Sequence, residues 1–274
     1  MTEAIDRWVS LPGGEFRLLE WAGAEPSAVF LHGLTGTADV WRPAIGALAP
    51  GAPHSFAIDQ RAHGRTNADG ARETARRMAR DVADLVAALG LERPHLVGHS
   101  MGGRIAIVAA AHYPQLFRSV AIVDIGPDAW KQNWVDSVNG FARMRPSLSP
   151  GDIVRTIQRR QLDADNEAAF RARFAEQPDG SFRPLGSVEA MSRMVRIQRS
   201  ASYWSDWEAI RPPALLVRGG DSDELRPHVF DQMRRRNPAV EVVEFAGVGH
   251  NVPLLAPARL AATLAAFWRN ISGR

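Results

Sequence analysis

The chain has 274 residues, of which 45% are hydrophobic and 23% charged, a composition that excludes wholesale disorder and suits one α/β domain with a sizeable core. Its 33 basic and 30 acidic residues leave a net charge of only +3, which argues against a nucleic-acid-binding protein. The absence of cysteine excludes disulfides, thiolate metal sites and a cysteine nucleophile.

The N-terminal segment "MTEAIDRWVS" has neither the basic region nor the apolar region of a signal peptide. The apolar run "IAIVAAA", residues 105–111, is far too short to cross a membrane. We therefore expect a cytoplasmic protein with no membrane partner.

Strand-like and helix-like segments alternate through residues 1–126. An antiparallel hairpin is expected around Pro12–Gly14. Residues 27–33 are a continuous apolar run ending at glycine, which is typical of a buried strand. Residues 73–90 carry apolar residues at i+3 and i+4 spacing and predict an amphipathic helix that closes at Gly90. The remaining predictions are helices over 38–49 and 101–113, and strands within 54–64, 95–98 and 118–126.

The alternation stops after Gly126–Pro127, and residues 128–207 show only helical patterns. One helix is predicted to begin at Ser149, because Pro150 and Asp152 complete an N-terminal signature there. We expect residues 128–207 to form an all-helical cap inserted into an α/β core of residues 1–127 and 208–274.

The strand–helix alternation returns after residue 207, with predicted strands around 212–218 and 239–247 and helices over 227–236 and 257–268. Buried-type strands that alternate with helices predict a mostly parallel, eight-stranded sheet with helices on both faces.

Gly98-His99-Ser100-Met101-Gly102 has the form G-x-S-x-G, with a predicted strand before it and a predicted helix after it. A serine on such a sharp turn needs glycine neighbours, so that the strand and the helix can approach closely. Ser100 is therefore the candidate nucleophile. The backbone N–H groups of Leu34, in "LHGLTG", and of Met101 are the candidate oxyanion donors.

A serine nucleophile needs a base, and His250 is the candidate among eight histidines. It follows a predicted strand and a glycine-rich turn, where sites at a sheet edge form. His32 is expected to be structural. The orienting carboxylate has two candidate positions. Asp124 ends the strand that follows the elbow helix, and Asp223 follows the strand "ALLVR".

These residues give the chain a resemblance to the α/β-hydrolase superfamily, carried by "HGLTG", "DQRAHG", "GHSMGG", "DIGP" and "GVGH". It resembles most closely the subset with a D-I-x-P motif, which includes small serine esterases and hydrolases of the acetylaminomethylene-succinate type. The resemblance implies an α/β-hydrolase fold and Asp124 as the acid, with Asp223 as the alternative. One departure is Ala62, which stands where the family's D-x-R-G-x-G turn has its first glycine.

The residues and the resemblance together imply a serine hydrolase that cleaves a small carboxylic ester through an acyl-enzyme. Amide or enamide, lactone and carbon–carbon bond hydrolysis are the alternatives on the same triad. We expect no metal or organic cofactor, a small-molecule substrate, no nucleic-acid partner, and a monomer or homodimer.

Substrate choice is expected to depend on the cap. Trp41 and Trp204 are the candidate substrate-binding residues. A basic helix side made by Arg193, Arg196 and Arg199 is either a solvated surface or a clamp for an acidic substrate group. Further aromatic and methionine side chains of the cap are expected to line a pocket or to form the cap's own core: Trp130, Trp134, Met144, Met191, Met194 and Trp207.

Overall fold

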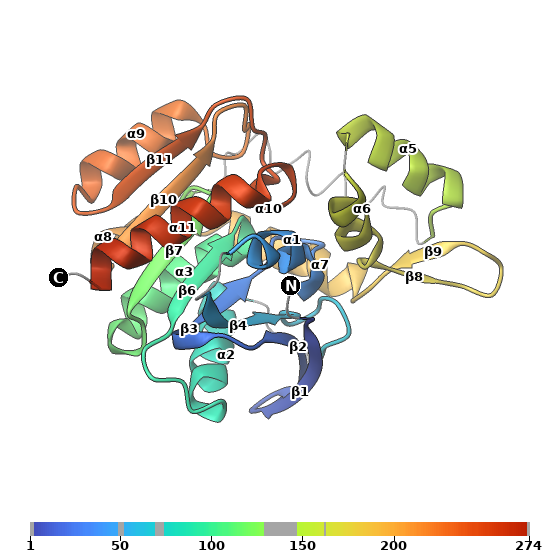
Figure 1. Ribbon diagram of the computed structural model, residues 1–274, viewed down its shortest axis with the longest axis horizontal. Helices are drawn as coiled ribbons and strands as arrows, with labels where there is room; N and C mark the ends of the chain where they lie inside the picture. The colour runs from blue at the N-terminus through green and yellow to red at the C-terminus, as the bar shows by residue number, and fades with distance from the viewer. Residues whose placement is uncertain (1–2, 49–51, 69–73, 129–146, 162, 273–274) are drawn as a thin grey trace.

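A mostly parallel sheet runs through the whole structure (Figure 1). The computed structural model describes residues 3–48, 52–68, 74–128, 147–161 and 163–272. The strands follow the order β1-β2-β4-β3-β6-β7-β10-β11, and the short strand β5 pairs with β2. Strands β1 and β2 are antiparallel to their neighbours, whereas the pairs from β4 to β11 are parallel. The bounds are Ile5–Leu11 (β1), Gly14–Trp21 (β2), Ala24–Leu31 (β3), Pro53–Ile58 (β4), Asn67–Ala68 (β5), His95–His99 (β6), Ser119–Val123 (β7), Ala214–Gly219 (β10) and Glu241–Phe245 (β11).

The expected eight-stranded sheet is thus confirmed, with β5 as a small addition. The expected opening hairpin is also present, because β1 and β2 pair antiparallel up to Leu11 and Gly14. The arrangement with helices on both faces follows from the way in which each strand divides its side chains.

Alternate side chains of the central strands enter two separate hydrophobic cores. In β3, for example, Val29 belongs to one core and Phe30 to the other. Helices α2, α3, α8 and α9 cover the first face, and α1, α10 and α11 cover the second. The bounds are Ala38–Trp41 (η1), Arg42–Gly46 (α1), Ala75–Ala88 (α2), Met101–His112 (α3), Pro114–Leu116 (η2), Trp204–Ala209 (α8), Pro227–Arg236 (α9), Val252–Leu255 (α10) and Pro257–Ser272 (α11).

We use the name cap for residues 128–207. Its described part contains α5 (Pro150–Arg160), α6 (Ala164–Arg171), β8 (Phe174–Glu176), β9 (Phe182–Pro184), α7 (Val188–Arg199) and α8. In Figure 1, α5, α6 and the β8–β9 hairpin lie to one side of the sheet. Helix α7 contributes Ala190 and Met194 to the first core. Helix α5 begins with the expected capping box, in which Ser149 and Asp152 each accept a hydrogen bond from the other's backbone N–H.

The expectation of an all-helical cap was wrong, because β8 and β9 form an antiparallel hairpin. The chain between them contains Pro178-Asp179-Gly180, which is a strong turn sequence. Phe174 and Phe182, one from each strand, pack against a small core formed by α5 and α6. This packing stabilises a hairpin of only three residues a strand, which has little stability of its own.

Candidate active site

Ser100 lies between β6 and α3 in a backbone conformation that non-glycine residues rarely adopt, with φ 53° and ψ −119°. The two flanking glycines make this turn possible. A Cβ at Gly98 would lie 2.2 Å from the Gly102 carbonyl oxygen, and a Cβ at Gly102 would lie 2.4 Å from the Leu31 carbonyl oxygen. The strand and the helix therefore approach more closely than any side chain permits, and Ser100 stands at the end of β6.

His250, in the loop between β11 and α10, lies within hydrogen-bond distance of Ser100. The distance from His250 Nε2 to Ser100 Oγ is 2.9 Å, and that from His250 Nδ1 to Asp124 Oδ2 is 2.7 Å. An ionised carboxylate only accepts hydrogen bonds, so Nδ1 carries the ring proton and donates a hydrogen bond to Asp124. His250 Nε2 is then the acceptor for the Ser100 hydroxyl.

Asp124 follows β7 directly and is fully buried. Its Oδ1 accepts a hydrogen bond from the Gly219 backbone N–H at 2.7 Å, and its Oδ2 accepts one from the Ser222 hydroxyl. With His250, three donors surround the carboxylate, which offsets the cost of burying it. Its own backbone has φ 54°, so Asp124 shares with Ser100 a left-handed conformation.

The structure brings Asp124, and not Asp223, to His250. Asp223 has an exposed side chain on the segment between β10 and α9. Ser222, one residue earlier, is buried and donates to Asp124. Its role as a donor to the acid was missed, and no local pattern signals it.

His99 holds the loop of His250 in place. Its Nε2–H donates to the His250 backbone carbonyl at 2.8 Å, and the two rings lie 4.9 Å apart. Burial, together with the neighbouring His250, lowers the pKa of His99 to about 3. His99 is therefore neutral at ordinary pH. Sequence reasoning missed this contact, because it joins residues that are 151 positions apart in the chain.

His32 is structural, as expected. It is fully buried, its Nδ1–H donates to the Gly33 carbonyl at 2.7 Å, and its Nε2 accepts from the Gln60 backbone N–H at 3.0 Å. Burial lowers the pKa of His32 to about 4. The ring thus links the turn after β3 to the turn after β4.

The turn after β3, residues 33–36, contains the candidate oxyanion donor Leu34, and we call it the oxyanion turn. Leu34 and Met101 both line the pocket at Ser100. Met101 is the first residue of α3, where backbone N–H groups have no partner inside the helix. Neither amide has a hydrogen-bond acceptor in the described part of the chain. Both amides therefore remain the candidate oxyanion donors.

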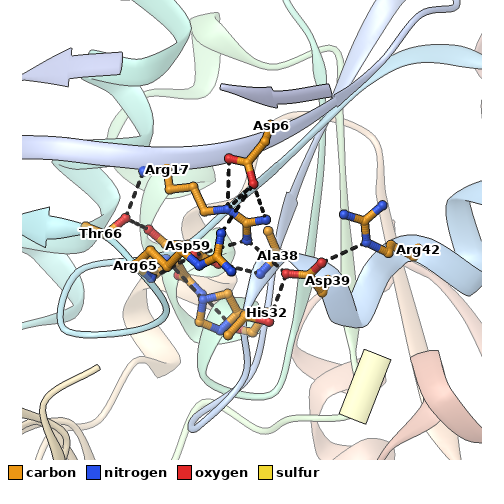
Figure 2. A network of polar contacts seen from close by, with 11 residues as sticks. Asp6, Arg17, His32, Ala38, Asp39, Arg42, Asp59, Arg65 and Thr66 are labelled. Atoms are coloured by element: carbon orange, nitrogen blue, oxygen red, sulfur yellow. Dashed lines mark hydrogen bonds and ion pairs between the residues drawn. The ribbon is translucent and has the colours of Figure 1, made fainter. Parts of the chain in front are cut away.

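A buried ion-pair network supports the chain that follows the oxyanion turn (Figure 2). Arg17, at its centre, donates to Asp39 at 2.8 Å and to Asp59 at 3.3 Å. Asp59 in turn accepts from the Ala38 backbone N–H at 2.7 Å. Burial would raise the pKa of Asp39, but Arg17 and Arg42 hold it below its usual value. Strands β2 and β4 are thereby joined to η1.

Ala62, which stands where the family turn has its first glycine, has φ 67°, in the left-handed region that favours glycine. Its carbonyl accepts from the Ser187 backbone N–H at 3.0 Å, and the neighbouring His63 forms a bridge with Gly186. The turn after β4 thus contacts the cap just before α7.

Ser100 opens into a pocket whose space of about 310 Å³ includes open solvent. It is lined by Leu34, Ser100, Met101, Arg104, Ile125, Met194, Val195 and Gln198. Three of these residues belong to α7, so the cap forms one wall of the pocket. A wider depression of about 1040 Å³, between α1, α6 and the start of α11, contains none of them.

The structure does not bring the two candidate tryptophans to this pocket. Trp41 is fully buried in the core beside α1 and α11, with its ring centroid 5.1 Å from that of Phe30. Trp204 lies on α8, where its indole N–H donates to Asp128 and Arg236 lies 4.5 Å above its ring. Trp41 was predicted from its place after the oxyanion turn and Trp204 from its place in the cap, and neither place distinguishes a pocket wall from a core.

Several other cap residues have clear places. Met194 lines the pocket, while Met191 and Trp207 are fully buried. Arg193 pairs with Glu189 at 2.9 Å on the outer side of α7, and Arg196 is exposed. The Arg199 side chain and residues Trp130, Trp134 and Met144 lie outside what the structure describes.

Within the described ranges there is no group of three or more histidine and carboxylate side chains that could hold a metal ion. None of the helices in those ranges combines the length and the apolar character that a membrane crossing requires.

The sheet order and the site at its edge define a family. The model of the alpha/beta hydrolase family matches residues 28–263, and the chain belongs to this family. It is a hydrolase of that family. The resemblance seen in the sequence is thereby confirmed.

Individual relatives are similar over most of the chain. A 2-(acetamidomethylene)succinate hydrolase from Mesorhizobium japonicum is 30% identical over 86% of this chain and 85% of its own. The Mycobacterium tuberculosis esterase Rv0045c is 28% identical over 85% of this chain and 80% of its own. The crystal structure of E-2-(acetamidomethylene)succinate hydrolase superimposes with a TM-score of 0.87 at 27% identity, and covers 97% of this chain and all of that one.

Proposed function

We propose that the protein is a serine hydrolase that cleaves a small carboxylic ester through an acyl-enzyme intermediate. The observation that carries this proposal is the hydrogen-bonded line from Asp124 through His250 to Ser100, which ends at a pocket. In this scheme His250 takes the proton of Ser100, and Ser100 attacks the carbonyl carbon. Asp124 holds the imidazole in the required tautomer and stabilises its protonated form.

The negative charge that develops on the carbonyl oxygen needs donors beside Ser100. Leu34 and Met101, whose amides are the candidate donors, line the same pocket, and the N-terminal end of α3 adds a positive dipole. His250 then protonates the leaving group, and a water molecule hydrolyses the acyl-enzyme by the same steps. Every proton in the cycle moves through His250.

The pocket favours a small acyl group. Only about 20 Å³ of its space can hold the centre of a water molecule, so the room beside Ser100 is narrow. Leu34, Ile125, Met194 and Val195 give it apolar walls. Arg104 also lines it, but its guanidinium donates to the carbonyl of Gly126 at 3.1 Å. A short, largely apolar acyl chain fits these walls best.

Hydrolysis of an amide-type bond is the second candidate. It is favoured by the relative that is named a 2-(acetamidomethylene)succinate hydrolase, with which this chain shares 30% identity over most of its length. The same triad supports this reaction, because His250 can protonate a nitrogen leaving group as well as an oxygen. Lactone and carbon–carbon bond cleavage remain alternatives on the same residues.

A substrate panel with a nucleophile variant tests the proposal. p-Nitrophenyl acetate and butyrate, a lactone and a short acidic amide are assayed with the wild type and Ser100→Ala. We expect turnover of the short esters in the wild type and a loss of about 10⁴-fold or more in the variant. Full ester turnover by Ser100→Ala would exclude Ser100 as the nucleophile. A wild type that hydrolyses only the amide would favour the second candidate.

A further inference from the structure

The oxyanion turn contains a residue in an unfavourable backbone conformation. Thr35 has φ 63°, and it is the only β-branched residue among the non-glycine residues of positive φ in the described ranges. A β-branched side chain is a genuine outlier in this region. Such a conformation persists only where surrounding contacts impose it. Thr35 directly follows the candidate donor Leu34, so the contacts that hold Thr35 also affect the position of the Leu34 amide.

Arg173 of the cap supplies two of these contacts. It lies between α6 and β8, and its Nε–H donates to the Thr35 carbonyl at 2.8 Å. A second donor of the same guanidinium, at Nη2, bonds the Thr35 hydroxyl. One rigid, planar guanidinium thus forms hydrogen bonds with both the backbone and the side chain of Thr35.

Arg173 is itself held within the cap. Its guanidinium lies 5.4 Å from the ring of the buried Phe170, and its backbone carbonyl accepts from the Leu185 N–H at 2.8 Å. Phe170 belongs to the small core that α5, α6 and the β8–β9 hairpin share. The position of Arg173 therefore follows the position of the cap as a whole.

Leu34 gives the oxyanion turn a second contact with the cap. Its side chain packs against Met191 and Val195 of α7. On the core side, the Gly36 N–H donates to the Gly33 carbonyl at 2.9 Å, and His32 donates to the same carbonyl. The turn is thus closed on itself below and held by the cap above.

We propose that Arg173 is a positioning residue for the reaction, which holds the oxyanion turn through Thr35 so that the Leu34 amide points at the reacting carbonyl. The cap then has two roles. It forms one wall of the pocket, and its contact with the oxyanion turn completes the oxyanion site. This inference rests on the proposed serine-hydrolase function. It assigns Arg173 to the protein's own backbone and not to an acidic group of the substrate.

The test uses a neutral ester, p-nitrophenyl acetate, which offers no carboxylate to an arginine. We expect Arg173→Ala to lower kcat about 10-fold to 100-fold, with KM changed less than 3-fold, because a misplaced oxyanion donor weakens transition-state binding only. Arg173→Lys, which keeps the charge but not the paired donors, should recover only part of the loss. Thr35→Val should lower kcat about 3-fold, and it is informative even if Arg173→Ala folds poorly.

Arg183→Ala is the matched control, because Arg183 is an exposed arginine on strand β9 of the same hairpin. It should keep the wild-type kcat. Unchanged kcat in Arg173→Ala and Thr35→Val would overturn the inference. So would an Arg173→Ala defect that appears only with acidic substrates and only in KM.

A trifluoromethyl ketone separates failure of this inference from failure of the proposed function. Its carbonyl is attacked by the serine, and the adduct places an oxyanion against the candidate donors. If the wild type does not bind it and a fluorophosphonate does not label Ser100, the proposed function fails. If the wild type binds it and both variants bind it equally well, only the role of Arg173 fails. The inference expects weakening of about 10-fold or more in Arg173→Ala.

Discussion

Ser100 and Asp124 both have backbone conformations in the left-handed region, with φ values of 53° and 54°. Thr35 in the oxyanion turn is a third such residue. Each costs conformational free energy of about 1–3 kcal/mol, and such residues gather at functional sites because neighbouring structure can hold them there. At Asp124 those neighbours are the Gly219 amide and the Ser222 hydroxyl. Three of the six non-glycine residues with positive φ in the described ranges therefore lie around the candidate site.

The identity of the acid can be tested directly. We expect Asp124→Asn to lower kcat by about 10⁴-fold, because an amide in place of the carboxylate favours the wrong tautomer of His250. Asp223→Asn should stay within 2-fold of the wild type, since its side chain is exposed and His250 bonds Asp124. Steady-state kinetics on p-nitrophenyl acetate measure both variants. A larger loss in Asp223→Asn would reverse the assignment.

At the scale of elements, the junction of β6 and α3 depends on close backbone packing. Gly102 lies in the first turn of α3, directly against the carbonyl oxygens of Leu31 and His32, which a Cβ would approach to 2.4 and 2.7 Å. Backbone atoms cannot rotate away as a flexible side chain can. The elbow therefore requires glycine here for reasons of space, although alanine is the better helix former.

Gly102→Ala should therefore destabilise the protein by about 3 kcal/mol, since the added methyl group overpacks the junction. Gly90→Ala is the control. Gly90 ends α2 with φ 64° and has open space around it, so the change costs only the left-handed conformation, about 1 kcal/mol. Urea unfolding measures both. Equal free energies of unfolding for the two variants would show that the contact with β3 relaxes without cost.

At the scale of the whole molecule, burial of histidine links stability to pH. His32, His63 and His99 lie in the described interior close to the site, and burial lowers their pKa values to about 4, 3 and 3. In the unfolded chain each would titrate near pH 6.5. The folded state therefore excludes protons that the unfolded state binds as the pH falls.

His63 is the clearest case, because its Nε2 is buried without a hydrogen-bond partner. A lowered pKa means that its contribution to stability is complete above about pH 6.5 and declines as the pH falls toward 3. Between pH 7 and pH 5, protonation of His63 in the unfolded chain should lower the wild type's free energy of unfolding by about 2 kcal/mol. The same loss should be missing in His63→Gln, as measured by urea unfolding at both pH values. Parallel losses in the two proteins would contradict the prediction.

The sequence by itself determined the alternation of elements and the sheet with helices on both faces, and it indicated Ser100 and His250 as the candidate nucleophile and base. Each depends on a local signal, such as hydrophobic period, glycine spacing or a position after a strand. Chain-local chemistry is visible in a sequence because the residues that interact are also neighbours along it. The turn sequence Pro178-Asp179-Gly180 is also a local signal. It predicts the hairpin of the cap, but the helical patterns on both sides hid it.

Tertiary structure alone decided how distant parts of the chain meet. The pairing of β7 with β10 brings Gly219 and Ser222 to Asp124, which distinguishes this acid from Asp223. Because η1 packs on the second face of the sheet, Trp41 is buried in the core there and does not reach a ligand. Arg173 and Thr35 are 138 residues apart and meet only because the cap docks on the core. Such contacts depend on packing in three dimensions, which no period or motif in the chain encodes locally.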